Sequence, residues 1–95
     1  FVDGGGLVLG ICNGFQTLVK LGLLPGLVRG RLEQRVSLVA NDRLGYWDAW
    51  VRLAVDRESP CVFTRALPPT IELPSRHGEG KLIYESEALR QELED

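Results

Sequence analysis

A cysteine between two glycines is the feature of this sequence best suited to chemistry. The string Gly10-Ile11-Cys12-Asn13-Gly14 has the form of a nucleophile elbow with cysteine in place of serine. Such an elbow holds its nucleophile on a tight strand-to-helix turn, and the glycines let the backbone bend and the helix approach. The start of the helix favours the thiolate, and the backbone N–H of Asn13 is placed to donate to an oxyanion. A buried structural cysteine at a strand end is the alternative for so short a pattern.

Four further residues are candidates for the same site. His77, the single histidine, and Glu79 have the His-x-Glu spacing of a base and the residue that orients it; the alternative is a loop histidine that shapes the site or contacts a partner. Gln16 lies one helical turn beyond Cys12, near enough to contact a substrate, although a polar residue is ordinary near a helix start. Asn41 follows a predicted strand, where sites of α/β proteins often lie, but Asn-Asp is also a common turn sequence.

The sequence argues against several other kinds of site. One histidine and two separated cysteines, Cys12 and Cys61, give no metal-ligand spacing, and there is no Gly-x-Gly-x-x-Gly or Walker lysine motif. The net charge of −2 argues against nucleic-acid binding. With no apolar run of about 18 residues and no secretory signal, we expect no membrane span, a cytoplasmic location and free thiols, with Cys61 packed. Arg29, Arg31 and Arg35 form a loose basic cluster that we expect to be solvated or to contact a partner.

The surrounding residues predict the elements that would hold these side chains. The apolar run 7–11 follows a glycine turn and is typical of a buried, parallel strand. From Asn13 the apolar positions recur with helical spacing, until Leu24-Pro25-Gly26 ends the helix. Ser86 can cap a last helix. Short strands are expected at residues 36–40, 47–55, 71–73 and 81–84, and the alternation over 47–55 predicts a half-exposed antiparallel strand.

Length and composition predict one partial domain, residues 1–95. The 95 residues, 44% of them hydrophobic, are enough for a core. The chain opens at Phe1 and contains no Met, so we expect it to be a piece of a longer protein. The mixture of elements is α/β, and such a sheet needs more strands and helices than this chain supplies. Association with a second copy would be an alternative way to cover its open strand edges.

Longer strings carry a resemblance to a known family. Residues 6–16, Gly-Leu-Val-Leu-Gly-Ile-Cys-Asn-Gly-Phe-Gln, and residues 18–26, Leu-Val-Lys-Leu-Gly-Leu-Leu-Pro-Gly, resemble the class I (triad-type) glutamine amidotransferases. Within them the chain is similar to the glutaminase subunits of phosphoribosylformylglycinamidine synthases, enzymes of purine biosynthesis. The stretch from Glu72-Leu73-Pro74 to His77-Gly78-Glu79-Gly80 resembles that family's Pro-x-x-His-Gly-Glu-Gly segment, so the resemblance covers nearly the whole chain.

The resemblance implies an incomplete flavodoxin-like domain with a glutamine-hydrolysing, ammonia-supplying activity. Cys12 would attack the side-chain amide of glutamine and form a glutamyl thioester, which water would release as glutamate. Asn13, Gly14 and Gln16 would bind the substrate or the oxyanion, with Asn41 helping through its backbone. The ammonia would pass to a partner synthetase, which would hold ATP and magnesium, so that this domain would need no cofactor.

The sequence also departs from the family in ways that bear on activity. The family's catalytic histidine and glutamate lie in a Met-Pro-His-Pro-Glu-Arg segment, which these 95 residues do not contain. His77 matches a segment upstream of that histidine, which favours a site-shaping role for His77 and Glu79. The glycine-rich loop with the other oxyanion donor is absent too, so the chain alone is predicted to be inactive. The alternatives are a truncated docking module and another Cys-elbow enzyme such as a peptidase, although the run from Asn13 to Gln16 argues against the second.

Overall fold

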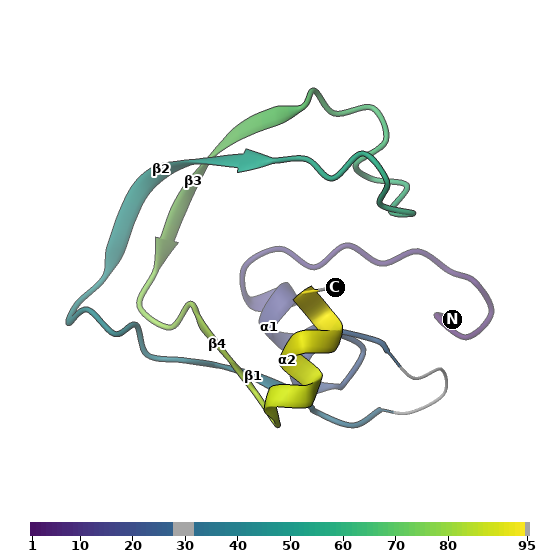
Figure 1. The fold of residues 1–95 in the computed structure, drawn as a ribbon, viewed down its shortest axis with the longest axis horizontal. Helices are drawn as coiled ribbons and strands as arrows, with labels where there is room; N and C mark the ends of the chain where they lie inside the picture. The colour runs from purple at the N-terminus through teal and green to yellow at the C-terminus, as the bar shows by residue number, and fades with distance from the viewer. Residues whose placement is uncertain (28–31, 95) are drawn as a thin grey trace. The chain divides into compact units, whose positions relative to one another are not determined.

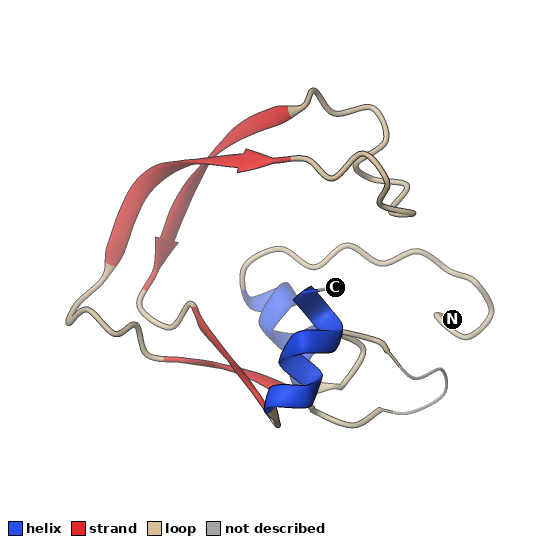
Figure 2. Cartoon of the chain, viewed as in Figure 1, coloured by secondary structure: helices blue, strands red, loops and turns tan. Residues whose placement is uncertain are grey.

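A computed structural model of the chain describes residues 1–27 and 32–94. Within them the helices and strands follow one another in the order α1, β1, β2, β3, β4, α2 (Figures 1 and 2). Their bounds are Asn13–Lys20 for α1, Val36–Val39 for β1, Trp47–Ala54 for β2, Thr70–His77 for β3, Lys81–Tyr84 for β4 and Glu87–Glu94 for α2. The chain divides into two compact units. Unit 1 is Phe1–Ala40 with Glu79–Asp95, and unit 2 is Asn41–Gly78.

Unit 1 holds both helices and a short antiparallel pair of strands. β1 pairs with β4, so that Val36 lies opposite Tyr84 and Val39 opposite Lys81. The buried core is a cluster of Val19, Val36 and Leu89, with Leu24, Tyr84 and Leu93 packed against it. α1 begins at Asn13, as predicted, and its buried residue, Val19, lies on the predicted apolar face. This packing fixes α1, and through α1 it fixes the residue that precedes the helix.

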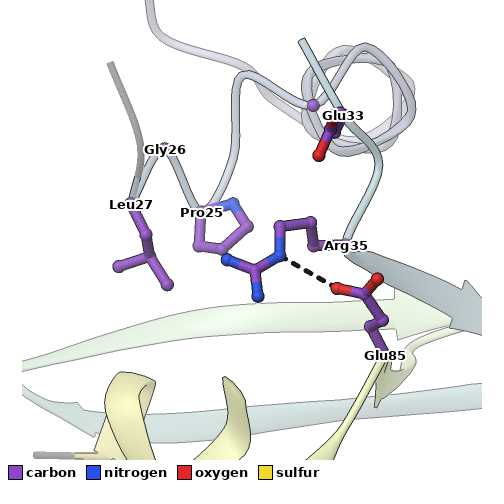
Figure 3. A pocket seen from close by; sticks show the side chains of 7 residues that line it. Pro25, Gly26, Leu27, Glu33, Arg35 and Glu85 are labelled. Atoms are coloured by element: carbon purple, nitrogen blue, oxygen red, sulfur yellow. Dashed lines mark hydrogen bonds and ion pairs between the residues drawn. The ribbon is translucent and has the colours of Figure 1, made fainter. Parts of the chain in front are cut away.

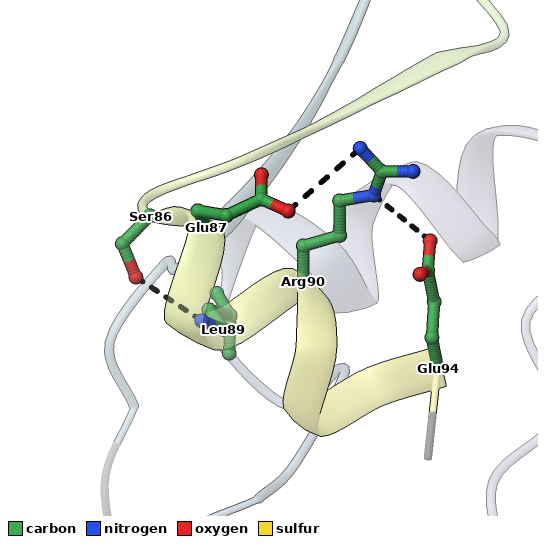
Figure 4. Close-up of polar contacts among 5 residues, drawn as sticks. All are labelled: Ser86, Glu87, Leu89, Arg90 and Glu94. Carbon is green, nitrogen blue, oxygen red and sulfur yellow. Dashed lines mark hydrogen bonds and ion pairs between the residues drawn. The ribbon is translucent and has the colours of Figure 1, made fainter.

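The last helix, α2, has the N-cap that the sequence predicts. The Ser86 Oγ accepts a hydrogen bond from the backbone N–H of Leu89 at 3.2 Å (Figure 4). This bond satisfies one of the N–H groups that a helix leaves without an acceptor in its first turn. Arg90 donates to Glu94 at 2.9 Å and lies 3.9 Å from Glu87, so ion pairs follow the exposed side of the helix.

Unit 2 is a two-stranded antiparallel ribbon. β2 and β3 pair along their whole length, from Trp47 opposite His77 to Ala54 opposite Thr70. The predicted alternation in β2 is confirmed over Ala49, Trp50 and Val51, where Trp50 is 74% exposed between two half-buried residues, but not at Leu53, which is 43% exposed. The strand expected at residues 71–73 is longer than predicted.

β3 continues through Pro74 to His77, so the expectation of a loop histidine is wrong. Proline is tolerated here because both strands of a two-stranded sheet are edge strands, where a residue without an N–H need not break the ladder. His77 is therefore held by strand pairing, opposite Trp47.

The buried parallel strand predicted for residues 7–11 is not present. The run has no strand pairing, and its large side chains are open to solvent, with Leu7 62% and Ile11 75% exposed. A parallel strand forms only beside another strand, and both observed sheets of the described residues are antiparallel pairs made without this run. The prediction of a buried parallel strand at residues 7–11 is therefore wrong for the described structure.

Two other expectations concern the surface. Neither α1 nor α2, the helices of the described residues, is long and apolar enough to cross a membrane. Arg29 and Arg31 of the expected basic cluster lie outside the described residues. Arg35 is not simply solvated, since its Nε donates to the Glu85 carboxylate at 2.9 Å.

Candidate active site

Cys12 stands at the junction between the unpaired run and α1, in a conformation that few residues adopt. Its backbone has φ 55° and ψ −118°, and it is the N-cap residue of the helix. Of the described residues other than glycine, it alone has a positive φ. Such backbone angles cost about 1–3 kcal/mol and concentrate at functional sites. The Cys12 thiol is free and exposed, so this turn presents the sulfur to solvent, as a nucleophile elbow requires.

The space around Gly10 differs from the space around Gly14. A β-carbon on Gly10 would lie 2.9 Å from the carbonyl carbon and oxygen of Gly14, and 2.6 Å from the Leu18 Cδ1. Gly10 therefore permits the close approach of the helix to the chain before it. A β-carbon on Gly14 would meet nothing within 4 Å. The predicted need for a small residue is thus confirmed at Gly10, whereas contacts within the described residues give no such reason at Gly14.

The backbone N–H groups that follow Cys12 differ in whether they already donate a hydrogen bond. Asn13 is the first residue of α1, so its N–H has no acceptor within the helix. The Gly14 N–H donates to the Ile11 carbonyl at 2.9 Å, and the Gln16 N–H donates to the Cys12 carbonyl at 3.2 Å. The Asn13 N–H, the one expected to serve an oxyanion, therefore has no acceptor within the helix.

Unit 1 also brings together two of the predicted site residues, Gln16 and Glu79. They line a pocket of about 120 Å³ with Lys20, Gln34 and Ser37, among others. The Gln34 Nε2 donates to the Ser37 Oγ at 2.7 Å. The pocket lies one helical turn beyond Cys12 along α1, and its lining offers an amide, an ammonium group and a carboxylate.

The remaining two predicted residues, Asn41 and His77, meet in unit 2. The Asn41 Nδ2 donates to the His77 carbonyl at 3.0 Å, and the Asn41 Oδ1 lies 3.1 Å from the His77 Nδ1. The backbone N–H of Asn41 donates to the Gly78 carbonyl at 3.0 Å. The partner of the imidazole is thus Asn41, whereas the sequence suggested Glu79, which belongs to unit 1. The two residues are 36 positions apart, and no local pattern pairs them.

Unit 1 has a second pocket. None of the described residues that line it was predicted as a site residue. It has a volume of about 290 Å³, and Arg35, Glu33 and Glu85 face it beside Pro25 and Leu27 (Figure 3). The hydrogen bond to Glu85 raises the pKa of Arg35 above its ordinary value. The Arg35 guanidinium and the Glu85 carboxylate therefore pair with each other at this pocket.

Two other expectations concern cysteine and metal chemistry. Cys61 is a free thiol, as predicted, but it is exposed and not packed. Its apolar neighbours Val62 and Phe63 are also open to solvent, so nothing buries this turn. Over residues 1–27 and 32–94, no three His, Cys, Asp or Glu side chains come together as a metal site would need.

Comparison with known proteins gives a consistent result. The model of the CobB/CobQ-like glutamine amidotransferase domain matches residues 1–95. Phosphoribosylformylglycinamidine synthase subunit PurQ of Dehalococcoides mccartyi is 43% identical over 91 residues, which cover 96% of this chain and 34% of that protein. The PurQ subunits of Methanococcus maripaludis and Treponema denticola are 41% and 33% identical, over 100% and 98% of this chain and 34% and 37% of theirs. The chain thus spans about a third of the length of these relatives. No solved structure matches it.

Proposed function

The chain belongs to the CobB/CobQ-like glutamine amidotransferase family, and from this premise we propose that it is part of the glutamine-hydrolysing subunit of a phosphoribosylformylglycinamidine synthase. The observation that carries the proposal is the backbone of Cys12, whose φ of 55° turns an exposed thiol outward at the start of α1. The family description supplies glutamine as the substrate class, and the names of the relatives supply the synthase.

In the proposed reaction Cys12 attacks the side-chain amide carbon of glutamine. The thiolate sulfur forms the new bond, and the carbonyl oxygen takes up the negative charge. The Asn13 N–H is placed to stabilise that oxygen. The tetrahedral intermediate expels the amide nitrogen, which takes a proton and leaves as ammonia. Water then hydrolyses the glutamyl thioester, and glutamate is released with the thiol restored.

The pocket beside α1 supports glutamine as the substrate. A free amino acid carries an ammonium and a carboxylate, and the pocket offers an opposite charge for each, in Glu79 and Lys20. Gln16 adds an amide that both donates and accepts hydrogen bonds. We assign substrate binding to Gln16 and Glu79 on these grounds, with Lys20 as an addition that the sequence patterns did not single out.

The synthetase is the proposed partner, and ATP and magnesium are assigned to it. We further propose that the 95-residue chain does not turn over glutamine by itself, because it contains neither the His-Pro-Glu segment nor the glycine-rich loop of the family. The cytoplasm is the proposed location.

The proposal is tested with an electrophilic analogue of glutamine, such as a chloroketone, and peptide mass mapping. The chain contains its own control, because Cys12 and Cys61 are both exposed free thiols. Iodoacetamide should modify both. In the longer protein that contains this chain, the analogue should modify Cys12 alone, glutamine should protect it, and Cys12→Ala should abolish glutaminase activity. Equal labelling of Cys12 and Cys61, without protection by glutamine, would show that Cys12 is an ordinary surface thiol.

A further inference from the structure

The contacts of Asn41 determine which nitrogen of His77 carries the proton. The side-chain amide of Asn41 faces the His77 carbonyl on one side and the His77 Nδ1 on the other, at 3.0 and 3.1 Å. Only the Nδ2 can donate to a carbonyl, so the Asn41 oxygen must face the ring. The reverse orientation would place two oxygen acceptors against each other. Because that oxygen accepts hydrogen bonds only, the Nδ1 must donate, and it carries the proton of the neutral ring.

Backbone contacts hold both Asn41 and His77 in place. The backbone N–H of Asn41 donates to the Gly78 carbonyl at 3.0 Å, which ties the start of unit 2 to its end. His77 is held on its other side by pairing with Trp47. Both His77 and Asn41 are half-buried. The two residues also help to line an open pocket in unit 2, with a volume of about 740 Å³, beside Tyr46, Trp47 and Ser75.

We infer that Asn41 is a positioning residue for His77: it locks the neutral imidazole in the Nδ1–H form, which leaves the Nε2 as a hydrogen-bond acceptor. The ligand group that meets the Nε2 must then be a donor, such as an amide N–H, a hydroxyl or an ammonium. A neutral histidine in water favours the opposite tautomer, with the proton on the Nε2, so the lock reverses the usual preference. The inference is independent of the proposed glutaminase activity.

The test uses nitrogen NMR of the full chain labelled with ¹⁵N-histidine, at an alkaline pH where imidazoles are neutral. His77 is the only histidine, so its two ring nitrogens need no assignment among others. In the natural sequence the Nδ1 should have the ¹⁵N chemical shift of a protonated nitrogen, and the Nε2 that of an unprotonated nitrogen. Asn41→Ala removes the acceptor that faces the Nδ1 and should reverse that preference. Ser75→Ala, at the same pocket, is the matched control and should change nothing.

Two results would overturn the inference. A proton on the Nε2 of the unsubstituted chain would do so directly, without any variant. A folded Asn41→Ala chain with an unchanged tautomer would show that Asn41 does not set it. If Asn41→Ala fails to fold, the spectrum of the unsubstituted chain still decides whether the Nδ1 carries the proton.

Discussion

Replacing Gly10 with alanine gives the sharpest test of the elbow. The new β-carbon would lie 2.9 Å from two backbone atoms of Gly14, where ordinary contact begins at 3.4 Å. The Leu18 Cδ1 at 2.6 Å can rotate away, but the backbone of α1 cannot move without the helix. Overpacking of this kind costs about 1–3 kcal/mol. The first turn of α1 should therefore open roughly 5 to 150 times more often.

Gly14→Ala is the matched control for Gly10→Ala. Its β-carbon meets nothing within 4 Å, and alanine is favoured over glycine in a helix by up to about 1 kcal/mol. Hydrogen exchange of the α1 amides, followed by NMR, measures the free energy of local opening for both variants. Exchange should be faster in Gly10→Ala and unchanged or slower in Gly14→Ala. Equal exchange rates in the two variants would refute the close approach of α1 to Gly10.

Three further predictions follow from single residues. Cys12→Gly should slow α1 exchange by relieving about 1–3 kcal/mol of backbone strain at φ 55°, whereas Cys12→Ala keeps the β-carbon and should not. Ser86→Ala should destabilise α2 by about 1 kcal/mol through loss of the bond to the Leu89 N–H, with Ser86→Asp as the control that retains it, both read from α2 amide exchange. The hydrogen bond from Arg76 lowers the pKa of Asp48 below its ordinary value. The stability that this pair contributes is therefore fully present when the pH is above the ordinary pKa of an aspartate. It is lost as the pH falls through the lowered pKa of Asp48 in the folded chain. NMR titration of the Asp48 carboxyl should show that Arg76→Gln raises its pKa, and an unchanged titration would contradict the pairing.

The parts of the fold that depend on neighbouring residues were predictable. The start of α1 at Asn13 follows from the glycine turn and helical spacing, and the Ser86 cap follows from residue type and position. The alternation in β2 reports directly which side of a strand is covered. Each of these signals is complete within about ten residues, so it does not depend on which distant segments are present.

The parts that depend on distant residues were not predictable. The run 7–11 has the composition of a buried strand, yet a strand needs a neighbour that composition does not name. The sequence predicted a strand only at residues 71–73, and only the pairing with β2 shows that β3 continues through Pro74 as an edge strand. The bond between Asn41 and His77 joins residues 36 positions apart. For this reason the His-x-Glu spacing suggested Glu79 as the partner of His77, although all three residues were identified as candidates.

The backbone of Cys12 is itself an argument for a chemical role. Its strain of about 1–3 kcal/mol must be offset by packing elsewhere, and the cluster of Val19, Val36 and Leu89 anchors the helix that follows it. Glycine at position 12 would remove the strain, but it would remove the thiol as well. Stability and the presence of the sulfur are therefore opposed at this one residue. A cysteine that served only as packing would be buried, whereas this one is exposed and gains no such compensation, which supports the proposed role of its thiol.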